Sequence, residues 1–208
     1  FILPAYEAQA HAAAALVGAL DAYCSAKGDI ATVEAAFADT FLAWQRSSIV
    51  MLGPIMAAEG PMRVQLWPDP KGFSDRAVRA ALGAEDPALL AEGGLEGRSI
   101  ALTNLSALEA LVYDDLTPET YACALATAIA TFQADAIRHV QARAVHIAED
   151  MTNSLDFLHA AGHAHPRGNE GIPDDKADIA RAGLILYAVR CKIRDGHGDA
   201  GLFHSRER

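Results

Sequence analysis

Three polar residues that lie close together in the sequence are the first candidates for chemistry. They are Asn104, Ser106 and Glu109, within the segment RSIALTNLSALEALVYDD of residues 98–115. Residues three apart share one face of a helix, so Ser106 and Glu109 can act on the same ligand. A carboxylate in such a position can be an oxygen ligand for a metal ion or a general base. A binding or catalytic site in this segment would therefore depend on Glu109.

The apolar residues around Glu109 predict a helix at the centre of its domain. They follow two lines at helical spacing: Ala101, Leu105, Leu108 and Val112, and then Leu102, Ser106, Glu109 and Tyr113. A helix that is apolar nearly all round is normally central, and a carboxylate buried in it must be paired, hydrogen-bonded or protonated. We expect Glu109 to be mostly buried, with Ser106 within reach. The alternative is a glutamate at the rim of the domain that pairs with an arginine.

A long loop predicted over residues 53–72 supplies further candidates. It holds four prolines yet also several large apolar residues, among them Trp67. Loops of this length in a compact domain are usually functional or packed down by their own side chains. Trp67 is expected either to plug the end of a helical bundle or, with Asp69, to line a cleft beside Glu109. Trp44, on a predicted helix before the loop, is expected to pack against the bundle as well. The candidate ligand-binding residues are Glu109, Ser106, Asn104, Trp67, Asp69 and Trp44.

Histidines form the second group of candidates. His159 and His163 lie four residues apart in the segment HAAGHAH, where both could reach one metal ion. Surface histidines near the end of a helix are the alternative interpretation. His146 and Glu149 could likewise hold a metal or form an ion pair within one helical turn. None of these segments is the HExxH pattern of zinc proteases.

Composition and missing motifs exclude several classes of function. The 208 residues carry a formal net charge of −10, with a pI near 5.1, which argues against a nucleic-acid or anionic-membrane surface. The GxSxG motif, the phosphate loop and the dinucleotide-binding fingerprint do not occur. The longest early apolar run, residues 12–20, is too short to span a bilayer. We expect neither a transmembrane segment nor a signal peptide in this chain.

The elements that must position these residues are all predicted to be helices. Apolar residues step by three and four from Leu3 to Cys24 and again from Val33 to Met51, with Asp29 as the expected cap between the two helices. A connection this short makes the helices antiparallel neighbours. We expect an N-terminal bundle over residues 1–116, and a long helix followed by a smaller helical part over residues 117–208. Cys24, Cys123 and Cys191 are expected to be buried free thiols.

A resemblance to a known family rests on the order WQR…GP…WPDPKG…LTNLSALEALVY. This order resembles the imelysin-like family, whose members occur in bacterial periplasms and cell envelopes, are often regulated by iron and are classed with metallopeptidases. The family pattern is Gly-x-His-x-x-Glu. Here Asn104 stands at the glycine position and Ser106 at the histidine position, while Glu109 is kept.

The resemblance implies an all-α fold of antiparallel helical bundles and a role in the periplasm or cell envelope. The leading hypothesis is a protein of iron or metal acquisition that binds a small ligand or a metal ion without catalysing a reaction. A divalent metal ion is the candidate cofactor, an envelope protein is a candidate partner, and nucleic acid is not expected. One alternative is a metallopeptidase that uses Glu109 as ligand or general base. The other is a helical interaction scaffold.

Overall fold

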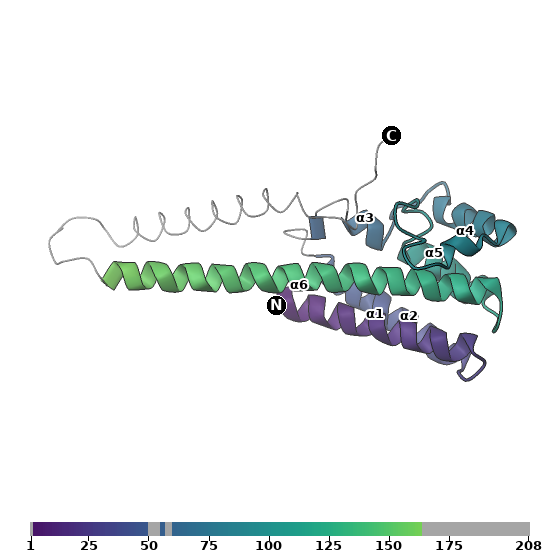
Figure 1. Ribbon diagram of the computed structural model, residues 1–208, viewed down its shortest axis with the longest axis horizontal. Coiled ribbons are helices and arrows are strands. Elements are labelled where there is room, and N and C mark those ends of the chain that lie inside the picture. The colour runs from purple at the N-terminus through teal and green to yellow at the C-terminus, as the bar shows by residue number, and fades with distance from the viewer. Residues whose placement is uncertain (1, 50–54, 57–59, 164–208) are drawn as a thin grey trace. The chain divides into compact units, whose positions relative to one another are not determined.

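The computed structural model of this chain describes residues 2–49, 55–56 and 60–163 (Figure 1). Within these ranges the regular elements are all helical, so the prediction of an all-α fold is confirmed. Their order is α1 Ile2–Cys24, α2 Ile30–Ser47, α3 Gly60–Val64, α4 Phe73–Ala84, the 3-10 helix η2 Pro87–Leu89, α5 Leu105–Ala110, the π-helix η3 Leu111–Asp115 and α6 Tyr121–His163. In this part of the chain, none of the helices combines the length and apolar character needed to cross a bilayer.

Helices α1 and α2 pack against each other, as the short connection between them predicts. Asp29 caps α2 by accepting a hydrogen bond from the backbone N–H of Ala31 at 2.9 Å. Between the helices, the Ser47 hydroxyl donates to Gln9 Oε1 at 2.7 Å, and both side chains are buried. This contact satisfies two polar groups that would otherwise destabilise the interior.

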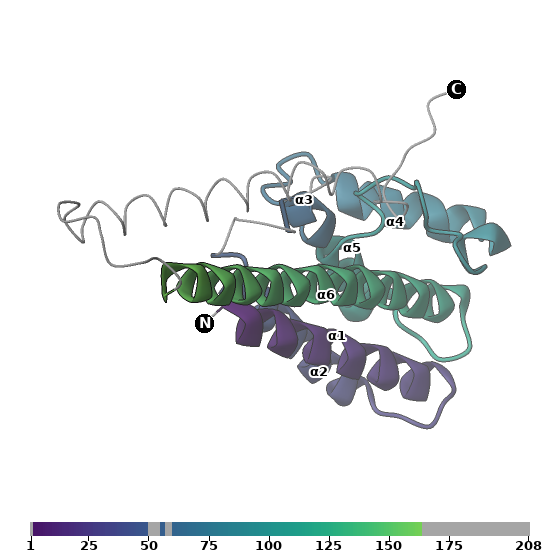
Figure 2. The same cartoon turned by 60° about the vertical axis from the view of Figure 1, so that its left-hand side comes forward.

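The first part of α6 forms the centre of the bundle. Figures 1 and 2 show it between α1 and α2 on one side and α4 and α5 on the other. Leu125, Ala126 and Ile129 have no exposed surface. Farther along the helices, Ala10 and Ala13 of α1 form a buried cluster with α6 residues Ala134 and Ile137. Small alanines allow the helices to approach closely, because they leave little side-chain bulk between the backbones.

The long helix that we expected after residue 117 is α6. It runs without a break from Tyr121 to His163. One compact unit contains the described residues up to Gln141, and a second unit begins at Ala142. The division therefore falls inside α6 rather than at the expected boundary of 116/117. The physical reason is that the first half of α6 supplies core residues to the first unit.

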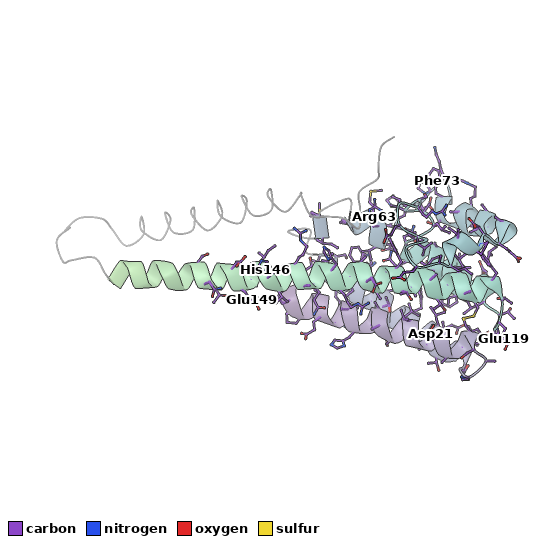
Figure 3. All side chains as sticks on the ribbon, in the orientation of Figure 1. Asp21, Arg63, Phe73, Glu119, His146 and Glu149 are labelled. Atoms are coloured by element: carbon purple, nitrogen blue, oxygen red, sulfur yellow. A yellow bond between two sulfur atoms is a disulfide. The ribbon has the colours of Figure 1, made fainter. Side chains whose placement is uncertain are left out.

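A disulfide bond joins Cys24 to Cys123, with Cα atoms 5.5 Å apart. The prediction that these cysteines are buried free thiols is wrong. The end of α1 meets the start of α6 near Glu119 (Figure 3), whose backbone N–H donates to the carbonyl oxygen of Cys24 at 3.1 Å. That juxtaposition brings the two cysteines within the Cα separation that a disulfide requires. Cys191 lies outside the described residues.

Candidate functional site

Asn104 forms the N-terminal cap of α5, which begins later than predicted. We expected one helix over residues 98–115, but α5 begins at Leu105 because the Asn104 side chain ends the preceding turns. Its Oδ1 accepts from the Ala107 N–H at 3.0 Å, and its Nδ2 donates to the Ile100 carbonyl at 2.6 Å and to Ser74 Oγ at 3.2 Å. Asn104 is fully buried. Its polar atoms are thus bonded to protein partners, which makes it a residue that connects α5 to α4.

Glu109 lies on the exposed side of α5, so the prediction that it is buried and hydrogen-bonded is wrong. The buried side of α5 and η3 is formed by Leu105, Leu108, Leu111 and Val112, none more than 3% exposed. Ser106 is half-buried and Tyr113 is 53% exposed, so the part of this line within α5 and η3 faces outward, whereas Leu102 at its start is buried. Among the residues that the structure describes, the Glu109 carboxylate has neither a hydrogen-bond donor nor a basic partner. The alternative interpretation, a glutamate at the rim of the domain, is therefore correct about where Glu109 lies. The arginine that we expected to pair with it is not found among the described residues.

The two tryptophans have opposite environments. Trp44 is buried in α2, as predicted, and its Nε1 donates to Gln65 Oε1 at 2.9 Å. Trp67 is 75% exposed, so the prediction that it plugs the bundle is wrong. The peptide bond between Trp67 and Pro68 is cis. The loop is attached to the bundle through Gln65 and the buried Val64, and this leaves Trp67 on the surface.

Asp69 serves as a cap for α4. Its Oδ1 accepts from the Phe73 N–H at 2.8 Å and its Oδ2 from the Ser74 N–H at 2.9 Å. These hydrogen bonds, from Ser74 first and then from Phe73, lower the pKa of the Asp69 carboxyl below its usual 3.8. Both oxygens are occupied at the start of α4, where Phe73 itself lies on the surface (Figure 3).

The six candidate ligand-binding residues therefore do not form one site. Three of them make structural hydrogen bonds in two separate places, and the others are exposed or half-buried. Asn104 and Asp69 both bond to Ser74, one through its hydroxyl and the other through its backbone N–H. Trp44 is bonded to Gln65. Glu109 and Trp67 are exposed, and Ser106 is half-buried. Within the described ranges, there is no buried carboxylate around which these six side chains could converge.

The histidine candidates belong to the second compact unit. His159 and His163 lie on the backbone of α6, but their side chains are outside the described part of the chain. His146 Nε2 is 3.5 Å from Oδ2 of Asp150, four residues on, so the expected pairing with Glu149 is replaced by one with Asp150. Among the described residues, no group of three or more His, Cys, Asp or Glu side chains is placed to hold a metal ion.

Gln133 is a structural residue that the sequence analysis did not identify. It lies on α6, is 3% exposed, and its Nε2 donates to the carbonyl oxygens of Arg63 and Thr103. Thr103 directly precedes the cap residue Asn104. The hydrogen bond from Gln133 therefore holds the backbone segment that leads into α5. Its Oε1 is buried and has no partner among the described residues. One glutamine beside an apolar stripe gives no sequence signal that would reveal this role.

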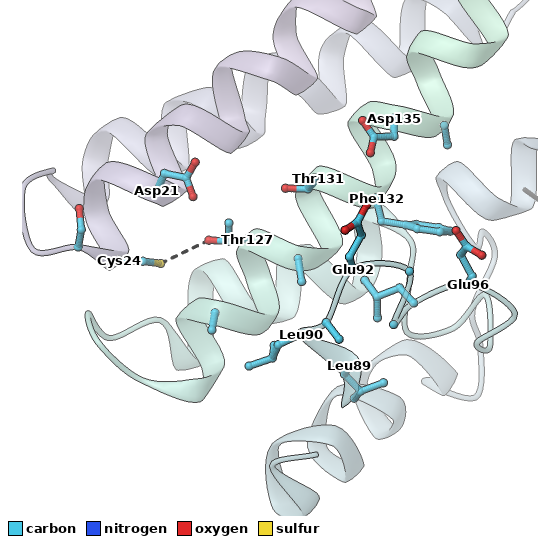
Figure 4. Close-up of a pocket in the computed structure, with 18 residues that line it drawn as sticks. Asp21, Cys24, Leu89, Leu90, Glu92, Glu96, Thr127, Thr131, Phe132 and Asp135 are labelled. Carbon is cyan, nitrogen blue, oxygen red and sulfur yellow. Dashed lines mark hydrogen bonds between the residues drawn. The ribbon is translucent and has the colours of Figure 1, made fainter. Parts of the chain in front are cut away.

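A surface pocket of about 720 Å³ lies on another side of α6 (Figure 4). Its walls are the end of α1, the loop after η2 and one face of α6. The lining residues include Asp21, Leu89, Leu90, Glu92, Leu95, Glu96, Thr127, Thr131, Phe132 and Asp135. The sequence analysis predicted no site here, because its carboxylates come from three separate segments.

Comparison with known proteins gives the family. The family model for imelysin, which carries a peptidase name, matches residues 2–178. The chain belongs to the imelysin family. No curated protein sequence matches this imelysin-family chain. Among solved structures, it is similar to an imelysin-like protein from Psychrobacter arcticum 273-4, with a TM-score of 0.63 and 18% sequence identity. The match covers 69% of this chain and 46% of that one, so the present chain corresponds to less than half of its structural relative.

Proposed function

We propose that this imelysin-family chain acts in the cell envelope as a binding protein of iron or metal acquisition, without peptidase activity. The proposal rests on the residues at the positions of the family motif. Ser106 stands where the family has histidine, and the Glu109 carboxylate is exposed. The ligand-binding surface that we propose is the outward line of Ser106, Glu109 and Tyr113, with the exposed Trp67 as a further contact.

The donor set at the motif does not fit a transition metal. Tight binding of Zn²⁺ or Fe²⁺ usually needs imidazole or thiolate ligands, whereas Ser106 offers a hydroxyl and Glu109 a carboxylate. Asn104 and Asp69 cannot complete the set, because their polar atoms are bonded within the protein. A metallopeptidase needs a bound metal with an open coordination position. We therefore derive no hydrolytic step at this motif.

The disulfide between Cys24 and Cys123 supports the proposed location. Disulfides persist in oxidising compartments such as the bacterial periplasm and are rare in a reducing cytosol. The bond links residues 99 positions apart, within the compact unit that contains the motif. It is consistent with the envelope role that the family resemblance implies.

An interaction scaffold is the second candidate function, favoured by exposed aromatic side chains. Trp67 and Tyr113 are 75% and 53% exposed. Aromatic residues are enriched in protein–protein interfaces, because they bury large apolar areas with few rotatable bonds. The partner in this case would be another envelope protein.

Metal analysis of protein purified without a histidine tag tests the proposal. We expect no stoichiometric transition metal bound through Glu109, and no peptide cleavage above background with added Zn²⁺ or Fe²⁺. Weak zinc binding, followed by titration calorimetry, should disappear in the His159→Ala/His163→Ala variant and persist in Glu109→Gln. Zinc binding lost in Glu109→Gln, or metal-dependent peptide cleavage by the parent, would instead support the metallopeptidase.

A further inference from the structure

The pocket beside the disulfide combines an apolar interior with charges of one sign. Its apolar lining comes from Leu89, Leu90, Leu95, Phe132 and several alanines. Leu89 and Leu95 are buried and hold the loop against the bundle, whereas Leu90 is 36% exposed. A volume of about 720 Å³ is within the range of pockets that hold small organic ligands.

Four carboxylates line this pocket, and its lining contains no lysine, arginine or histidine. Asp21 comes from α1, Asp135 from α6, and Glu92 and Glu96 from the loop between η2 and α5 (Figure 4). Asp135 pairs with Arg138 on the same helix, and both side chains are largely exposed. Within the described part of the chain, Asp21, Glu92 and Glu96 form no ion pair. These three exposed carboxylates have no counter-charge within the pocket lining, and a bound cation would reduce the repulsion among them.

The loop between η2 and α5 places the Glu96 carboxyl next to the backbone of Gly93, the residue that follows Glu92. Gly93 has a φ of +71°, and a Cβ added to it would lie 3.6 Å from the carboxyl carbon of Glu96. The Glu96 side chain thus folds back over Gly93, which directly follows Glu92. The basic residue of this loop is Arg98, whose Nε donates to the Gly94 carbonyl at 3.0 Å. Arg98 is not among the residues that line the pocket.

Phe132 gives the pocket an aromatic surface beside these carboxylates. Figure 4 shows its side chain pointing from α6 toward the loop that carries Glu92 and Glu96. An ammonium group over an aromatic face is attracted by the ring, and the attraction adds to that of nearby carboxylates. The apolar lining would accept the remainder of such a ligand.

We propose that this pocket binds a small organic cation with an apolar body, such as an aliphatic or aromatic amine. The ammonium group lies near Glu92 and Glu96, and the apolar part contacts Phe132 and the leucines. Charge complementarity selects this class, because the carboxylates would repel an anion, and a neutral apolar ligand would leave Asp21, Glu92 and Glu96 without a counter-charge. The site is separate from the family motif, so it stands whether or not the motif binds a ligand.

Calorimetric titration with three matched probes tests the proposal. The probes are 4-phenylbutylamine, 4-phenyl-1-butanol and 4-phenylbutyrate, which share a phenylbutyl group and differ in charge. We expect the amine to bind about tenfold more tightly than the alcohol at low salt, because the two exposed carboxylates Glu92 and Glu96 each contribute a few-fold. The preference should decrease as salt is added. The butyrate should not bind measurably.

The paired variant Glu92→Gln/Glu96→Gln provides the mutational test. It should remove most of the preference for the amine over the alcohol and leave the binding of the alcohol nearly unchanged. Glu7→Gln is the matched control, because Glu7 is exposed on α1 about 20 Å along the helix from Asp21. Equal affinity for amine and alcohol, absence of amine binding, or an unchanged preference in the paired variant would overturn the proposal.

Discussion

Cys24 is bonded to Cys123 at the place where the end of α1 meets the start of α6. The bond closes a covalent loop with a sequence separation of 99 residues, which includes α2, α4 and the whole motif segment. The closed loop therefore contains most of the first compact unit.

Breaking this bond should destabilise the protein. A cross-link of this span restricts the unfolded chain, so we expect Cys24→Ser/Cys123→Ser to lower the free energy of unfolding by about 2–5 kcal/mol. Urea denaturation of the oxidised parent, the reduced parent and the variant measures the effect. The variant should lose its sensitivity to reductant. Equal stability of oxidised and reduced parent would contradict the prediction, as would three titratable thiols in the unreduced, denatured chain.

The two tryptophans should respond differently to truncation. Trp44→Ala empties a buried site and should cost about 3–5 kcal/mol, whereas Trp67→Ala removes an exposed side chain and should change stability by less than about 0.5 kcal/mol. Urea denaturation of both variants makes the comparison, with each serving as the reference for the other. Acrylamide should quench the fluorescence of Trp67, measured in Trp44→Phe, more strongly than that of Trp44, measured in Trp67→Phe. A large loss of stability in Trp67→Ala would show that this side chain is packed.

Asp69 should make the stability of the protein depend on acid. Its pKa is lower in the folded state than the usual 3.8, so its contribution is fully present above that value and is lost as the pH falls through the folded pKa. Asp69→Asn retains only one acceptor oxygen for two backbone donors and should be less stable near neutral pH. The difference in urea midpoint between parent and variant should be constant from about pH 5 to 7 and should shrink below about pH 4. The exposed Asp39, replaced in Asp39→Asn, is the control.

Restoring the family histidine tests why the motif lacks metal chemistry. Ser106 is half-buried on the outward line of α5, so Ser106→His should fold normally. An imidazole three residues before a glutamate provides two metal ligands on one face, and we expect zinc affinity to increase by about tenfold or more over the parent. Adding Glu109→Gln to this variant should abolish the gain. A Ser106→His variant with the zinc affinity of the parent would show that the outward line cannot hold a metal.

The sequence allowed the helices to be predicted better than the site. Hydrophobic spacing located α1 and α2, and Asp29 identified the start of α2, because these features depend on local geometry. The exposure of Glu109 depends on which side of a short helix packs against α6, and neighbouring residues alone do not determine that. The disulfide and the hydrogen bonds of Gln133 join residues far apart in the sequence, so periodicity contains no information about them. The pocket carboxylates also come from three distant segments.

Gln133 has a consequence for how mutational tolerance should be interpreted in this protein. Its amide donates to two carbonyl groups from different segments, and few side chains of similar size could do the same. A saturation scan should therefore find this position among the least tolerant, although it faces the interior and touches no proposed ligand. Glu109, on the surface, should accept many substitutions without loss of folding. In this protein, intolerance to substitution at a buried polar position such as Gln133 would therefore identify a residue needed for folding rather than a residue that contacts a ligand.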